Sequence, residues 1–306
     1  MKPGGTGIGA VALFEWSYAW RNRRALVLLA LYLLGAVGSA LLFTHVIGKI
    51  ENEVARALEV SPTRNPGAMT QSLLQHRKVR EIMTALVQDE ELARQLLDIP
   101  LFTLFYGWLS FTFVPLLVIL TASEVVAADL RLGAQRFLLQ RISRLAYALG
   151  KLAGQGLQLL ILLLLSVLCT WIVGDLRMAT FEPVKTAVTM LGFTCRVWIY
   201  TLPFLGIALG SSLVTKTENG ARSLALILFF ALVALRGVSE YYLERVDLSL
   251  GVRQLWTTLV LFLPQEHRLT LWRPEWESLT AGGIVCLGLM FFYFSIGLFF
   301  FHRRDL

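Results

Sequence analysis

The sequence has little charge and few side chains that bind metals or form disulfides. Asp, Glu, Lys and Arg together make up 16% of the 306 residues, whereas a soluble globular domain carries about 25% charge. The three cysteines, Cys169, Cys195 and Cys286, all lie inside apolar runs, where they are typical of small core residues. The four histidines are scattered at loops or at the edges of such runs. We therefore expect neither a disulfide framework nor a metal site.

Motifs for catalysis and nucleotide binding are also missing. The sequence contains no HExxH, no GxSxG and no Cys/His pair with ligand spacing. Residues 210–217, GSSLVTKT, approach a phosphate loop, but Thr215 stands where the second glycine is needed, and an apolar run precedes the segment instead of a strand. We expect no catalytic residue and no bound cofactor. The net charge of +7 does not indicate nucleic-acid binding, because no basic tail or aromatic-basic patch is present.

What the sequence does contain is long apolar runs. Hydrophobic residues make up 56% of the chain, and the runs are continuous rather than alternating, which is typical of membrane-spanning helices rather than barrel strands. We predict an all-α integral membrane protein whose residues 1–306 form one transmembrane domain with six transmembrane helices. The predicted spans cover about residues 25–47, 101–121, 147–173, 187–214, 223–238 and 279–301.

Three segments outside the spans have their own patterns. Residues 10–24 combine aromatic side chains with arginines, which is typical of a helix lying in the membrane interface; the alternative is a plain extension of the first span. Residues 48–100 form a long outer loop whose apolar residues recur at helical spacing. Residues 239–278 are aromatic and amphipathic, but their apolar centre is too short to cross a bilayer. They predict an outer re-entrant or interfacial hairpin.

A short basic stretch at residues 123–144 separates the second and third spans. Its basic excess places it on the cytoplasmic side, and with six spans both termini are then cytoplasmic. Its charges do not fall on one helical face, so we expect a break at Gly133. Interleaved acids and the apolar Phe137 and Leu138 favour a protein partner; the alternative is that the bases only set orientation and touch lipid phosphate. The candidate contact residues are Glu124, Asp129, Arg131, Arg136, Phe137, Leu138, Arg141 and Arg144.

The order of these features resembles the permease subunit of type-2 ATP-binding-cassette (ABC) exporters, including the branch that serves nitrous oxide reductase maturation. That family often shows an acid-rich stretch with Gly-Thr-Leu, a leucine run, Pro-Val-Ser-Arg and then Gly-Lys at the start of span three. The corresponding segments here are residues 133–135, 137–139, 141–144 and 150–151, with 263–264 in the outer hairpin and 303–306 at the end. Arg131 replaces the usual second acid and Arg141 replaces the proline.

The resemblance implies a cytoplasmic ABC ATPase in two copies, which binds ATP and Mg²⁺, and a second permease copy. Residues 123–144 would be the coupling helix seated in the ATPase. Membrane lipid and an exported accessory protein are further expected partners, in a bacterial or archaeal cytoplasmic (inner) membrane. Candidates for a dimer contact or the translocation path are Gly35, Gly38, Ser39 and Arg196. The alternatives are that the glycines pack spans within one chain and that Arg196 reaches the outer interface.

Few polar groups lie within the spans, so we expect an exported substrate that is amphipathic or hydrophobic. One alternative is a mechanical transmitter from the ATPase to an exported partner, without substrate passage, which the outer loop 48–100 permits. A membrane-embedded enzyme is a second alternative, against which the missing catalytic residues argue. A secondary carrier usually buries charges near the midplane, and only Arg196 is a candidate for such a charge.

Overall fold

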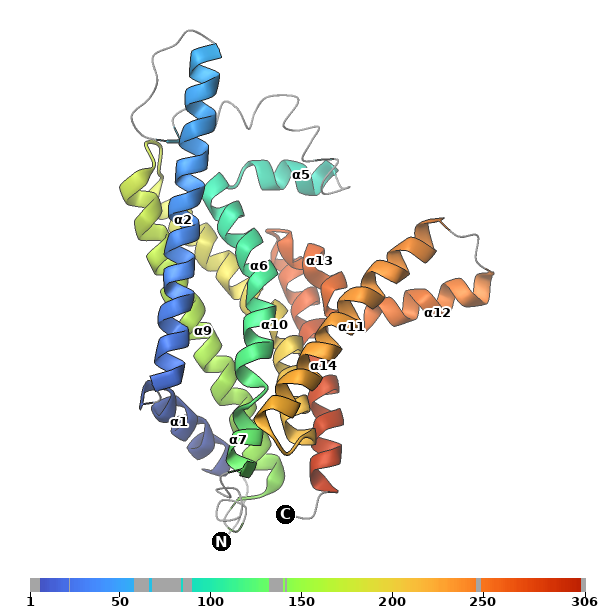
Figure 1. Cartoon of the computed structure of the whole chain (residues 1–306). Helices are drawn as coiled ribbons and strands as arrows, with labels where there is room; N and C mark the ends of the chain where they lie inside the picture. Colours follow the sequence, from blue (N-terminus) through green and yellow to red (C-terminus); the bar gives the residue numbers. More distant parts are fainter. Residues whose placement is uncertain are drawn as a thin grey trace.

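The computed structural model is built entirely from helices and connections in the residues that it describes (Figure 1). Those residues are 6–21, 23–57, 66–67, 84, 90–131, 140, 142–245 and 249–303. No strand occurs among them, which confirms the all-α prediction. Six helices in this part of the chain are long and apolar enough to cross a membrane, as predicted.

The six long helices extend past the limits expected from hydrophobicity. They are α2 (Arg23–Ala57), α6 (Leu101–Ala122), α9 (Arg144–Arg177), α10 (Pro183–Val214), α11 (Glu218–Arg245) and α14 (Trp276–His302). The largest differences concern α2, which continues to Ala57 instead of residue 47, and α11, which starts and ends outside the expected 223–238. A helix keeps its backbone hydrogen bonds beyond the apolar run, so a change in polarity need not end it.

The extra turns of α2 are held by contacts near Gly67. The backbone N–H of Gly67 donates to Glu51 Oε2 at 2.7 Å, and Thr180 Oγ1 donates to the Gly67 carbonyl at 2.6 Å. Gly67 has a φ of +104°, a conformation that glycine adopts easily. Glu51 is 1% exposed. Its carboxylate therefore joins the far end of α2 to the connection between α9 and α10.

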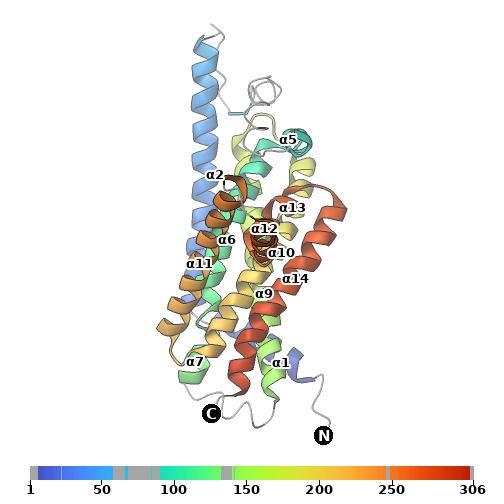
Figure 2. The same ribbon diagram turned by 90° about the vertical axis from the view of Figure 1, so that its right-hand side faces the viewer.

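The long helices form two layers. One contains α2, α6 and α11, and the other contains α9, α10 and α14 (Figures 1 and 2). Helix α10 packs against α6, α9, α11 and α14, and 83% of its apolar stretch is buried, against 11% in α2 and in α11. The core therefore surrounds α10, whereas most of the apolar surface of α2 and α11 is not covered by other described parts of the chain.

Glycines bring the backbones of α10 and α14 into direct contact. A Cβ added at Gly206 would lie 2.4 Å from the carbonyl oxygen of Met290, and one at Gly297 would lie 2.4 Å from the Cα of Gly210. Real Cβ atoms do not approach backbone so closely. Any larger side chain at these positions would push the two helices apart.

Short helices mark the two ends of the bundle. At the basal end, which also holds both chain termini, lie α1 (Thr6–Arg21) and α7 (Val125–Arg131). Helix α5 (Glu90–Leu97) lies at the opposite, distal end (Figure 1). The predicted hairpin consists of the end of α11, then α12 (Leu250–Leu261), η1 (Pro264–His267) and α13 (Arg268–Trp272). Helices α11 and α12 project from the side of the bundle (Figure 1).

Candidate functional site at the basal end

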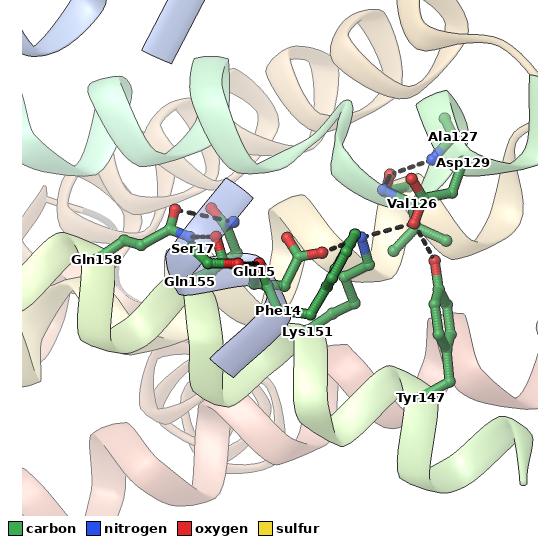
Figure 3. A network of polar contacts seen from close by, with 11 residues as sticks. Phe14, Glu15, Ser17, Val126, Ala127, Asp129, Tyr147, Lys151, Gln155 and Gln158 are labelled. Atoms are coloured by element: carbon green, nitrogen blue, oxygen red, sulfur yellow. Dashed lines mark hydrogen bonds and ion pairs between the residues drawn. The ribbon is translucent and has the colours of Figure 1, made fainter. Parts of the chain in front are cut away.

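A buried ion cluster joins three helices at the basal end. The ammonium Nζ of Lys151, near the start of α9, lies 2.5 Å from Glu15 Oε1 of α1 and 2.6 Å from Asp129 Oδ2 of α7 (Figure 3). The Tyr147 hydroxyl donates to the same Asp129 oxygen at 2.7 Å. Lys151 and Glu15 are each 4% exposed. One cation therefore balances two carboxylates that belong to separate elements.

Small residues on α9 allow α1 to approach this cluster. A Cβ added at Gly150 would lie 2.5 Å from the Val11 Cβ, and one at Gly154 would lie 2.8 Å from the Glu15 Cβ. The spacing of these glycines is the small-xxx-small pattern of close helix pairs. Gln158 adds a hydrogen bond from Nε2 to the Glu15 carbonyl at 2.9 Å (Figure 3). Helix α1 is thus held along α9, with Glu15 directed at Lys151.

Helix α7 is fastened to α10 by a hydroxyl group. Ser212 Oγ of α10 accepts hydrogen bonds from the backbone N–H groups of Val126 and Ala127, both at 3.0 Å. The first N–H groups of a helix have no partner within it, and a serine commonly satisfies them from the preceding position. Here the serine comes from a different helix, so the start of α7 cannot move without α10.

Two ion pairs connect α7 with α11. Glu124, which immediately precedes α7, pairs with Arg222, and Arg131 Nη2 lies 2.9 Å from Glu218 Oε1. Together with Asp129 and Ser212, these contacts tie α7 to α9, α10 and α11, while the chain itself continues into α7 from α6. A displacement of α7 would therefore act on four membrane-spanning helices at once.

The eight predicted contact residues divide into three groups. Glu124 and Asp129 direct their carboxylates at other helices of the same chain, and Arg144 donates to the carbonyl oxygens of Phe301 and His302 at 3.0 and 2.9 Å. Arg131 pairs with Glu218 but keeps 62% of its side chain exposed. The remaining four, together with the expected break at Gly133, lie outside the described residues: Arg136, Phe137, Leu138 and Arg141.

The candidates for a dimer contact lie on an open face of α2. A Cβ added at Gly35 or Gly38 meets no atom of the described structure within 4 Å. Ser39 Oγ donates to the carbonyl of Ala36 in its own helix at 2.9 Å. The two glycines therefore do not serve close packing between spans of the described part of the chain, and Ser39 is half-buried.

Arg196 has partners within the chain. Its Nη2 donates to the Pro274 carbonyl at 2.6 Å and its Nε donates to the Arg273 carbonyl at 3.3 Å. The residue is 7% exposed. These bonds join α10 to the connection between α13 and α14, and they satisfy a charge that is costly to bury unpaired. A role in the translocation path stays a prediction.

Sequence reasoning missed the part that Glu15, Lys151 and Ser212 play. Glu15 is the one acid in an otherwise apolar and aromatic helix, and Lys151 follows a glycine near the start of an apolar run. Each of these charges indicates an oppositely charged partner in the fold, because burying a single charge among apolar side chains is energetically costly. What the sequence does not show is that the two side chains meet. Ser212 carries no comparable signal.

The described residues contain no group of three or more His, Cys, Asp or Glu side chains placed to hold a metal ion. Comparison with known families shows a match over residues 10–306 to the family described as "ABC-2 family transporter protein". No curated protein matches the chain.

Proposed function

This chain belongs to the ABC-2 family of transporter proteins, and on that premise we propose that it forms a translocation path driven by ATP hydrolysis in a separate subunit. Family membership makes it the membrane-spanning permease component of an ABC transporter, which pairs with a cytoplasmic ATPase component and is not itself the catalytic part. The finer resemblance, to the branch for nitrous oxide reductase maturation, stays a prediction.

The attachment of α7 to four spans carries the proposal. Two ATPase copies bind ATP and Mg²⁺, and residues 123–144 of each permease sit in a cleft of the ATPase. Closure of the ATPases on ATP displaces α7. Because α7 is fixed to α9 by Asp129, to α10 by Ser212 and to α11 by Glu124, this displacement moves the spans. Arg131, which keeps 62% of its side chain exposed, would contact the ATPase together with the apolar pair Phe137 and Leu138.

The proposed orientation puts the basal end in the cytoplasm. Arginines lie at the helix ends there, including Arg21, Arg23, Arg222 and Arg303, and such clusters mark the cytoplasmic side. Both termini are then cytoplasmic, and residues 1–306 form one transmembrane domain in a bacterial or archaeal inner membrane. The permease works as a pair, surrounded by membrane lipid, with residues 48–100 outside and available to an exported accessory protein.

The proposed substrate is amphipathic or hydrophobic and moves outward. The exposed faces of the spans carry many large apolar side chains, such as Leu28, Leu34 and Phe230. A well-hydrated solute that moved along these faces would lose its water shell without gaining polar partners. Transport of an amphiphile fits these apolar faces.

The coupling stretch can be tested by charge reversal. We expect Phe137→Asp, or Arg136→Glu combined with Arg141→Glu, to release the cytoplasmic ATPase or to uncouple hydrolysis from transport. Loss of one partner of an interface charge pair costs about 2–5 kcal/mol. Co-purification of the ATPase and substrate-stimulated hydrolysis are the two measurements. Membrane fractionation shows that the variants still insert.

Arg253→Glu is the matched control, because Arg253 is an exposed arginine of α12, in the hairpin that is predicted to lie outside. It should change neither measurement. If the Phe137 and arginine variants retain both ATPase binding and stimulated hydrolysis, residues 123–144 are not the coupling element.

A further inference from the structure

A cavity of about 620 Å³ lies at the basal end between α2 and α6, with α9 behind it. Its volume is within the range of about 300–1,000 Å³ that is typical of small-molecule sites. Helix α2 packs on α9 and α1, whereas α6 packs mainly on α10. The two helices diverge towards the basal end (Figure 1), where residues of α1 and α7 also line the cavity.

The cavity has an apolar part and a charged part. Its apolar walls come from three spans and include Leu26, Leu29, Leu117, Val118, Leu162 and Leu165. Its basal side carries the ion cluster, with Gln155 and Gln158 beside it. A molecule with a hydrocarbon chain and a polar head would place the chain between the spans and the head at α7.

The charged part favours a positive head group. Among the lining residues that the structure describes, carboxylates outnumber cations by four to two: Glu15, Glu124, Asp129 and Glu218 against Arg131 and Lys151. Arg222 is not in this lining but pairs with Glu124, and these described groups together still carry one excess negative charge. Asp129 keeps 25% of its side chain exposed, whereas Glu15 and Lys151 keep 5%. Of the two carboxylates in the ion cluster, Asp129 is therefore the one with room for a second counter-ion.

Aromatic side chains of α1 add to this preference. Trp16, Trp20 and Tyr18 line the cavity next to Glu15, and the rings of Trp16 and Trp20 pack edge to face with centroids 5.5 Å apart. The faces of tryptophan and tyrosine rings attract ammonium groups. An anionic head would meet both the excess carboxylates and these rings, so acidic lipid is disfavoured.

From this arrangement we infer that the cavity binds amphiphiles with a cationic, ammonium-type head group, entering between α2 and α6. The head lies between Asp129 and the α1 aromatics, and the chain lies along Leu162 and Leu29. The inference rests on the proposed transport of amphiphiles and names both the charge class and the place where the substrate is first bound.

Binding can be measured on the permease alone, in nanodiscs of zwitterionic lipid, by titration calorimetry with empty nanodiscs as the blank. The probes share a twelve-carbon chain and differ in the head: dodecyltrimethylammonium, dodecyl phosphate and dodecyl maltoside, all below their micelle concentrations. We expect saturable binding of the ammonium probe only. No ATPase is present in this binding measurement, so a failure to bind the ammonium probe would not contradict the proposed coupling function. In turn, the co-purification experiment on the coupling stretch does not test the cavity.

Two leucines on α9 provide a matched pair of variants. Leu162 lines the cavity, whereas Leu164 is 39% exposed and does not line it. Leu162→Trp should fill the cavity and weaken ammonium binding at least about tenfold, and Leu164→Trp should leave it unchanged. Asp129→Asn should weaken binding of the ammonium probe as well, through the lost charge.

Three outcomes would overturn the inference. The first is equal binding of the phosphate or maltoside probe, which would mean simple partition into an apolar gap. The second is an equal loss of binding in the Leu164 and Leu162 variants. The third is the absence of saturable binding by a permease that remains folded, as judged by its unfolding temperature.

Discussion

Lys151 is the residue on which the order of the basal end depends most. Its ammonium is the shared partner of Glu15 and Asp129, and the three side chains belong to α9, α1 and α7. Burying three charges is itself expensive, and the pairing compensates for that cost only while the set is complete. The cluster therefore acts as a position-specific link between helices rather than as a general source of stability.

Removing Lys151 alone should be strongly destabilising. Lys151→Met leaves the buried Glu15 and the half-buried Asp129 without their cation, and the loss of one partner of a buried pair costs about 3–5 kcal/mol. Thermal unfolding in detergent measures this as a lower midpoint. Lys216→Met is the control, because Lys216 is an exposed lysine at the same end of the bundle and should have little effect.

The same reasoning predicts a rescue. Combining Lys151→Met with Glu15→Gln and Asp129→Asn removes the uncompensated charges, and neutral replacements of a complete ion cluster are often tolerated. The triple variant should therefore unfold at a higher temperature than Lys151→Met alone. An equal or lower midpoint would mean that the side chains are held by packing and not by their charges.

At the scale of the helices, the contact of α10 with α14 depends on glycine. Gly297 faces the backbone of Gly210, whereas Gly288, on the same helix, has no atom within 4 Å of an added Cβ. Gly297→Leu should force the helices apart and lower stability by at least about 1–3 kcal/mol, the usual cost of overpacking. Gly288→Leu should be neutral. The yield of folded protein and the unfolding midpoint distinguish the two, and equal behaviour would contradict the packing described above.

The existence of the spans was predictable because hydrocarbon thickness sets a minimum length of apolar helix. The residues at which the spans begin and end were less predictable. Helix α2 runs on to Ala57 because Glu51 finds Gly67, a contact between residues 16 apart that no local pattern reveals. The candidate site was predictable only in part, for the same reason. The sequence predicts that the acids of residues 123–144 contact a partner, which stays a prediction. It does not reveal that Asp129 and Glu124 also pair with helices of their own chain.

Contacts between residues that are distant in the sequence account for the other features of the site that the sequence does not predict. Glu15 and Lys151 are 136 residues apart, and Ser212 is 86 residues from the backbone group of Val126 that it satisfies. Charge and polarity identify such residues as needing partners. The choice of partner depends on how the helices cross, and that is set by glycines such as Gly154 at the α1–α9 contact.

At the scale of the whole molecule, one face has few partners in the described part of the chain. Helices α2 and α11 lie on either side of α6 along this face (Figure 1), and only 11% of the apolar stretch of each is buried. A bilayer can cover such surfaces. The group of small residues on α2 is more typical of a helix–helix contact than of a lipid contact. We therefore propose that the second copy contacts α2 at Gly35 and Gly38, where an added Cβ would meet no atom of the described structure within 4 Å.

A permease pair joined at α2 should be captured by a disulfide between two copies of Gly38→Cys. The background replaces Cys169, Cys195 and Cys286 by alanine, since all three are free thiols. Gly288→Cys is the control. An added Cβ at Gly288 also meets no atom of the described structure within 4 Å, but Gly288 belongs to α14, in the other layer. A disulfide needs Cα atoms within about 7 Å, so mild oxidation of the intact complex should give a dimer band for Gly38→Cys and none for Gly288→Cys. A dimer band of equal strength at both positions, or none at Gly38, would place the contact between copies elsewhere than on α2.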